Sequence, residues 1–243
     1  MFRSHSKFFT AIAMCFLVVA SALPQHQTFA GIINVGETVP LSQLLTGLDS
    51  IVVGDKTFDE FFYAPMGGAP AAEDVAVTGV QQSGGYGLVF TSGGFAAGGF
   101  NETSLDASIG FRVSVNDPTQ VIVGAELFGT VGTIGSGDAR ISEAFNNVPG
   151  SSLLIRQFRV DGDLISSKSS DVAVFDQGVS ELYVLKDISI EVPDVNSSLF
   201  DIGNLAELTT FRQLFFQEVI PEPTTISLAA LAMICIVSGR KRV

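Results

Sequence analysis

The chain has 243 residues and a formal net charge of −12, and 47% of its residues are hydrophobic. It contains two Cys, two His and no Trp. A surface with this acidic excess repels polyanions, which excludes nucleic acids and anionic lipids as the main partners.

Residues 1–30 have the form of a secretory signal peptide. Two basic residues precede an apolar core over residues 8–20, and Thr28-Phe29-Ala30 offers small residues at the cleavage positions. We predict cleavage after Ala30, with Ala22 as the alternative. The apolar core is near the short limit for crossing a membrane, so an uncleaved anchor is the competing interpretation.

The segment 31–220 is chemically restricted. His5, His26, Cys15 and Cys235 all lie outside it, so it has no His and no Cys. A Ser or Cys nucleophile would lack a His base, and a disulfide or a zinc site with His or Cys ligands cannot form. The segment carries 24 acidic side chains against eight basic ones, a difference of 16 negative charges. Its stability must come from an apolar core, for which the segment is long enough.

Apolar and alternating runs predict strands along this segment, after one helical turn at residues 40–45. Residues 109, 111, 113 and 115 give strict period-two alternation, and residues 182–192 mark a long strand near the end. Residues 93–99 predict a loop, and residues 176–178 a turn. The predicted strands are 51–53, 57–63, 74–80, 86–90, 109–115, 121–128, 139–145, 152–160, 172–175, 181–192 and 208–218.

The spacing of these strands predicts the fold class. No helix of crossover length separates them, which argues against parallel βαβ units. We therefore expect one all-β domain over residues 31–219, an antiparallel two-sheet sandwich of jelly-roll-like form. A single β-barrel is the alternative.

Paired carboxylates are the main chemistry that the missing His leaves open, since glycoside hydrolysis needs only two of them. Asp161 and Asp163 lie on a predicted turn, and Asp171 and Asp176 flank a strand, but acids at turns are commonly turn formers. Asp161 and Asp163 are also the best local candidate for a calcium site, although the EF-hand pattern is missing. We expect no catalytic residue and no cofactor other than this calcium.

Residues 220–243 combine three parts. Pro221-Glu222-Pro223 is extended and resists joining a helix or a strand. Residues 226–237 are apolar except for one Ser and predict a short transmembrane helix. Arg240, Lys241 and Arg242 form a basic end that would stay cytoplasmic, which leaves the triplet on the outer face.

This tail resembles the PEP-CTERM sorting signal of bacterial exported proteins, which is also catalogued as an ice-binding protein C-terminal domain. Pro221, Glu222 and Pro223 match the signature triplet, residues 226–237 the hydrophobic stretch, and residues 240–242 the basic end. The resemblance implies processing by an exosortase, a membrane protease-transpeptidase, in a Gram-negative bacterium that makes exopolysaccharide. Residues 57–115 and 183–190 are more loosely similar to PEP-CTERM proteins of planctomycetes and other environmental bacteria.

These features predict an exported protein that passes the Sec translocon and signal peptidase. It would be held briefly in the inner membrane, processed at its tail and released to the cell surface or extracellular matrix. We expect the β-sandwich to act structurally or to bind exopolysaccharide weakly. The alternatives are a secreted carbohydrate-active enzyme with paired carboxylates, and a surface protein whose membrane anchor is never cleaved.

Overall fold

The computed structural model describes residues 31–98, 104–193 and 203–220. The predicted signal peptide with Ala30, the Pro221-Glu222-Pro223 triplet, the apolar stretch 226–237 and Arg240, Lys241 and Arg242 lie outside the described residues. Among the described residues, no helix has the length and apolar character needed to span a membrane.

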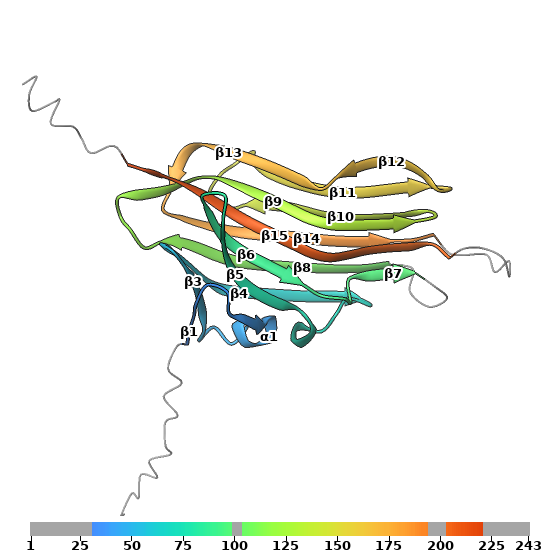
Figure 1. Ribbon diagram of the computed structural model, residues 1–243, viewed down its shortest axis with the longest axis horizontal. Helices are drawn as coiled ribbons and strands as arrows, with labels where there is room; N and C mark the ends of the chain where they lie inside the picture. Colours follow the sequence, from blue (N-terminus) through green and yellow to red (C-terminus); the bar gives the residue numbers. More distant parts are fainter. Residues whose placement is uncertain (1–30, 99–103, 194–202, 221–243) are drawn as a thin grey trace, which may run out of the picture.

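Two sheets form the molecule, with strands that run along its long axis (Figure 1). Among the described residues, all strand pairs are antiparallel except β1 with β3, and β7 joins the second sheet beside β15. The first sheet contains, in spatial order, β1 (Ile32–Ile33), β3 (Ser50–Val53), β4 (Lys56–Gly67), β8 (Ser104–Val115), β14 (Glu181–Glu191), β10 (Gly137–Phe145), β11 (Ser152–Val160) and β12 (Asp163–Lys168). The second contains β13 (Ser170–Val179), β9 (Gln120–Ile134), β15 (Leu205–Val219), β6 (Gly85–Thr91), β5 (Ala76–Gln82) and β2 (Thr38–Pro40), with β7 (Ala96–Gly98) at the side.

The strand order is that of a jelly roll. From β6 onward, setting aside the short strands β7 and β12, the first strand pairs with the last and each following strand pairs inward: β6 with β15, β8 with β14, β9 with β13, and β10 with β11. Nested pairing of this kind folds one long antiparallel ribbon into two sheets. The predicted antiparallel sandwich of jelly-roll-like form is confirmed, and the closed-barrel alternative is not adopted.

Phenylalanine rings fill the space between the sheets. Phe111 on β8 lies at the centre of this cluster, 6.1 Å from Phe58, 5.7 Å from Phe61 and 6.3 Å from Phe215 between ring centroids. Phe90 stacks on a second-sheet neighbour, Phe211, at 4.8 Å. Ring pairs at these spacings add attraction to the burial of their apolar area, so this cluster is a main source of stability.

Charged side chains are also enclosed in this core. Lys56 and Lys186 are fully buried, and so is Gln213, while Glu143 is nearly so. Lys186 forms an ion pair with Glu143, and Lys56 forms one with Asp55 at 2.6 Å. Buried charges are costly unless they are paired, so these residues are unusual members of a sandwich core.

The structure adds elements that the sequence did not predict. The helical turn is present as α1 (Leu41–Leu44), and a 3-10 turn, η1 (Ala72–Asp74), precedes β5. Strands β1, β2, β7 and β12 were not predicted, and β7 lies inside the predicted loop 93–99. The predicted turn at 176–178 is wrong, because these residues continue β13. Each of these segments is short or mostly exposed, so pairing with a neighbour, which local pattern cannot show, decides its conformation.

Candidate functional site

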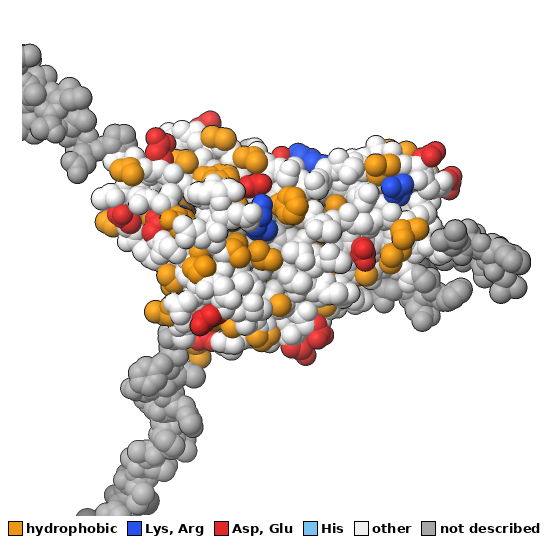
Figure 2. Space-filling view, in the orientation of Figure 1, with side chains coloured by type: hydrophobic (Ala, Val, Ile, Leu, Met, Phe, Trp, Pro, Cys, Tyr) orange, Lys and Arg blue, Asp and Glu red, His pale blue; other side chains and the backbone are white. Residues whose placement is uncertain are grey.

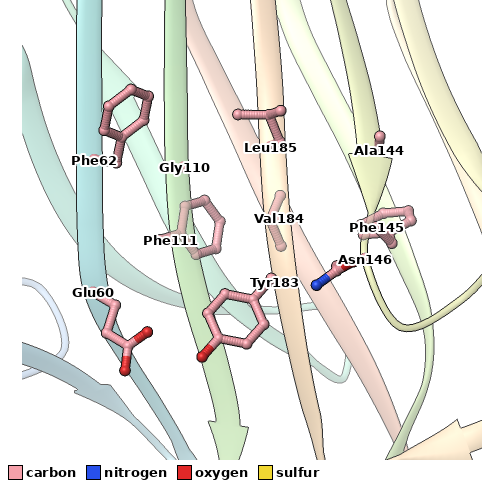
Figure 3. Close-up of a pocket in the computed structure, with 10 residues that line it drawn as sticks. All are labelled: Glu60, Phe62, Gly110, Phe111, Ala144, Phe145, Asn146, Tyr183, Val184 and Leu185. Carbon is pink, nitrogen blue, oxygen red and sulfur yellow. The ribbon is translucent and has the colours of Figure 1, made fainter.

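A hollow lies on the outer face of the first sheet, over the strands β4, β8, β14 and β10. The register aligns Phe62 with Gly110, Gly110 with Leu185, and Leu185 with Ala144. Figure 3 shows Phe62 on one side of Gly110 and the side chains of β14 on the other. Because Gly110 has no side chain, the space above it stays open and forms a hollow of about 550 Å³. This volume is in the range of small-molecule sites.

Apolar and aromatic side chains stand around this hollow and face solvent. Phe62 is 52% exposed, Leu185 50% and Tyr183 36%. Alternation in β4 and β14 turns these residues outward while their neighbours Phe61 and Val184 point into the core. Exposed apolar groups gathered at one place, rimmed by polar groups, are typical of a binding surface.

A β-bulge in β4 supplies the polar rim. The register shifts between Asp59 and Phe62, so that one extra residue is accommodated there. Glu60 takes a φ of 51°, a conformation uncommon for residues other than glycine. The bulge sets two carboxylates in succession, those of Asp59 and Glu60, against Arg112 of β8. Bulges commonly redirect side chains next to functional sites.

Arg112 gathers three carboxylates below the hollow. Its Nε and Nη2 donate to the two oxygens of Asp59, each at 2.8 Å. Nη2 also lies 3.1 Å from Glu60, and Nη1 lies 3.4 Å from Glu181. The hydrogen bonds to Asp59 raise the pKa of Arg112 further above its usual value, so the guanidinium stays charged. The polar rim is therefore acidic, and the Arg112 guanidinium holds its carboxylates in place.

Tyr183 and Asn146 complete the rim. A side-chain hydrogen bond with Glu60 raises the pKa of the Tyr183 phenol above its usual value. The backbone N–H of Asn146 donates to the carbonyl of Tyr183 at 3.0 Å, which fixes the end of β10 beside β14. The hollow thus combines an aromatic ring, a phenol, an amide and carboxylates around an apolar floor.

This arrangement suits a ligand that has both apolar faces and hydroxyl groups. A ring with C–H groups on its faces can lie against Phe62 and Tyr183, because aromatic faces are electron-rich. Carboxylate and amide oxygens can accept from hydroxyls at its edge. The chain carries a formal net charge of −12, which disfavours an anionic ligand. Acidic side chains also prevail among the charged groups on the opposite face of the molecule, where the second sheet lies in front (Figure 2).

The structure places the predicted acids elsewhere. Asp161 and Asp163 lie at the turn between β11 and β12, where Asp161 has a φ of 50° and its N–H donates to Ser136. Asp171 pairs with Lys168 at 2.7 Å and accepts from the Leu154 N–H. Within the described ranges, no group of three metal-ligating side chains is present. The calcium site at Asp161 and Asp163 stays a prediction.

Sequence reasoning missed the hollow because its residues are separated by up to 125 positions, from Glu60 to Leu185. One local signal was available. Phe62 and Tyr183 fall on the outward positions of alternating strands, where an aromatic ring is exposed unless something covers it.

The sequence matches no protein-family model and no curated protein. Several solved structures share a distant likeness. A carbohydrate-binding module, TmCBM61, solved with β-1,4-galactotriose, is 13% identical over 64% of this chain and 88% of its own, with a TM-score of 0.30. The family 32 module of C. perfringens NanJ, solved with galactose, is 12% identical over 65% and 94%, with a TM-score of 0.21. Endoglucanase 3 of Trichoderma harzianum is 8% identical over 66% and 98%, with a TM-score of 0.22. At such scores the likeness says nothing about ligand or activity, and the fold assignment rests on the strand order.

Proposed function

We propose that this chain is an exported surface or matrix protein whose sandwich binds a neutral polysaccharide at the Gly110 hollow without cleaving it. The observation that carries the proposal is the open floor at Gly110, bordered by the exposed side chains of Phe62, Tyr183 and Leu185. Sugar rings offer apolar faces and hydroxyl edges that match these groups.

The two chain ends support the export part of this proposal. The signal peptide predicted at residues 1–30 would direct secretion, and the tail at residues 220–243 resembles a sorting signal processed by an exosortase. A protein delivered in this way would meet exopolysaccharide at the cell surface. The acidic surface favours a neutral chain over an anionic one, because like charges repel.

Affinity electrophoresis through gels that contain neutral polysaccharides tests the binding site. We expect retardation of the wild-type chain and loss of retardation on Tyr183→Ala or Phe62→Ala. Phe128→Ala is the matched control, since Phe128 is an exposed ring on the second sheet, beneath Arg212. Equal retardation of all variants would refute the site.

A hydrolysis assay on any polysaccharide that binds tests the absence of cleavage. The competing proposal, a carbohydrate-active enzyme with paired carboxylates, requires release of reducing ends that Glu60→Gln or Glu181→Gln abolishes. Binding without release of reducing ends supports the present proposal.

A further inference from the structure

A second chemical site is enclosed between the two sheets and takes no part in the hollow. Lys186 on β14 and Glu143 on β10 stand directly opposite each other in the first sheet. Gln213 on β15 reaches them from the second sheet. The Lys186 Nζ donates to Glu143 Oε2 and to Gln213 Oε1, and it lies 5.9 Å from the centre of the Phe111 ring.

We infer that Lys186 and Gln213 join through an amide bond within the chain, with Glu143 as the proton carrier. The oxygen that accepts from Nζ is bonded to Gln213 Cδ, so the amine lies beside the carbon that it would attack. No cofactor, oxidant or external reactant is needed, since every reacting group belongs to the chain.

The reaction balances within these three side chains. Transfer of a proton from the Lys186 ammonium to Glu143 leaves a neutral amine and a carboxylic acid. The amine lone pair attacks Gln213 Cδ and forms the new C–N bond. Glu143 delivers its proton to the leaving Nε2, the old C–N bond breaks, and ammonia departs. The Glu143 carboxylate then takes the surplus proton from Nζ. Of the three protons of the Lys186 ammonium, one stays on the new amide nitrogen, one leaves in ammonia and one ends on the Glu143 carboxyl group.

Burial favours the reactive protonation states. Neither Lys186 nor Glu143 has solvent-accessible side-chain surface. Burial lowers the pKa of Lys186 and raises the pKa of Glu143, and both shifts favour the neutral pair, amine with acid. A neutral buried amine is a nucleophile, whereas a solvated ammonium is not.

Two buried polar atoms at this site lack a well-formed hydrogen bond. Among the described residues, the Gln213 Nε2 and Glu143 Oε1 have no partner with good geometry, although the Gln213 amide is close enough to Glu143 to offset part of the rise that burial causes in the pKa of its carboxyl. An unsatisfied buried polar group is costly in a core. Loss of ammonia removes the Gln213 NH₂ group altogether, and Glu143 Oε1 is the oxygen free to carry the proton.

A similar trio occurs four residues farther along β15, at Gln217, but is less enclosed. Lys56 donates to Asp55 Oδ1 at 2.6 Å and to Gln217 Oε1. The Asp55 side chain is 17% exposed, and Gln217 is only partly buried, so water can solvate this ion pair. The inference is therefore restricted to Lys186 and Gln213.

The bond would tie β14 of the first sheet to β15 of the second. The segment 31–220 contains no Cys, so an amide is a covalent brace that it can form without a disulfide. A cross-link between the sheets resists proteolysis and mechanical separation.

Peptide mass spectrometry on the purified full-length chain tests the inference. Trypsin cuts after Lys168, Arg212 and free Lys186, but not after an acylated lysine. We expect residues 169–212 to remain uncut and to be joined to the peptide that begins at Gln213, with the mass of one ammonia missing. Fragment spectra must contain both peptides, because an N-terminal Gln can lose ammonia by cyclising. A free peptide that ends at Lys186 as the main product would overturn the inference.

Two variants assign the roles. Glu143→Gln keeps the shape but removes the proton carrier, and the linked peptide should disappear while circular dichroism stays that of a β protein. Lys168→Met, at an exposed ion pair, should leave the link intact. A link that persists in Glu143→Gln refutes the role of Glu143, and a link found only between Lys56 and Gln217 refutes the proposed site. If Glu143→Gln does not fold, the wild-type digest still decides whether the bond exists.

Discussion

Replacing Gly110 by Val should weaken glycan binding at least tenfold and leave the sandwich folded. A Cβ at this position would meet the Val184 carbonyl oxygen at 3.5 Å and the Phe62 ring at 3.6 Å, which are ordinary contacts. Its φ is not in the left-handed region, so a side chain brings no backbone strain. The remaining atoms of the Val side chain must then occupy the floor of the hollow.

The two expected effects have opposite signs. Glycine in a strand costs roughly 0.5–1 kcal/mol relative to a residue with a side chain, so the variant should be equally or slightly more stable. At a urea dependence of about 1–3 kcal/mol per molar, the unfolding midpoint should rise by up to about 1 M. A ligand ring lifted from its floor loses close contact with Phe62 and Tyr183. We expect at least a tenfold loss of affinity, about 1.4 kcal/mol.

Urea unfolding and affinity electrophoresis on the same samples measure both effects. Ser108→Val is the matched control, because Ser108 lies on the same face of β8, two residues before Gly110, outside the hollow. Unchanged binding in a stable Gly110→Val variant would refute the site. Unfolding of that variant would show that the space above Gly110 is not open.

Three further predictions concern the core, pH and the tail. Phe111→Ala should lower the free energy of unfolding by about 3–5 kcal/mol, whereas Phe62→Ala on the outer face should lower it by less than about 1 kcal/mol, as measured by urea unfolding. Tyr63 donates to the Pro70 carbonyl, and burial raises its pKa to about 12, above the usual value near 10. The unfolded chain therefore loses this proton at a lower pH than the folded chain, so the free energy of unfolding should fall as pH rises from about 10 to 12. The fall should be less steep in Tyr63→Phe, and equal slopes in the two proteins would contradict this prediction. Glu222→Ala in the native host should leave the chain membrane-bound with its full tail, while the wild-type chain ends near the triplet; cell fractionation and intact mass distinguish the two, and identical species would indicate a permanent anchor.

The fold could be predicted from the sequence where alternation was strong. The predicted strands 109–115 and 181–192 lie in the two central strands of the first sheet. The second matches β14 almost to its bounds, whereas β8 begins five residues earlier than predicted, at Ser104. The jelly-roll form followed from strand number and the lack of crossover helices. Short edge strands such as β12 could not be predicted. It pairs only with β11, across a turn in which Asp161 and Gly162 both have positive φ.

The candidate site could not be predicted, because it is a property of register. Phe62, Gly110 and Leu185 come together only when β4, β8 and β14 align at these residues. A shift of one residue in the pairing of β4 with β8, or of β8 with β14, would turn the Phe62 ring into the core or place a side chain over the floor of the hollow. The acids that stood out in the sequence, Asp161 and Asp163, lie at the turn between β11 and β12, and neither lines the hollow.

The buried trio shows that a broken pattern can be as informative as a regular one. Lys186, Glu143 and Gln213 each interrupt an apolar alternation, so period-two geometry places all three toward the interior. The three inward series are Val184, Lys186 and Ile188; Ile141, Glu143 and Phe145; and Phe211, Gln213 and Phe215. A basic, an acidic and an amide side chain directed into one core must meet, because none can remain unpaired there. Each would lie against apolar side chains if its strand slipped by two residues. The trio therefore fixes the register of β10, β14 and β15 before any covalent bond forms, and the same constraint holds the amine against the carboxamide long enough to react.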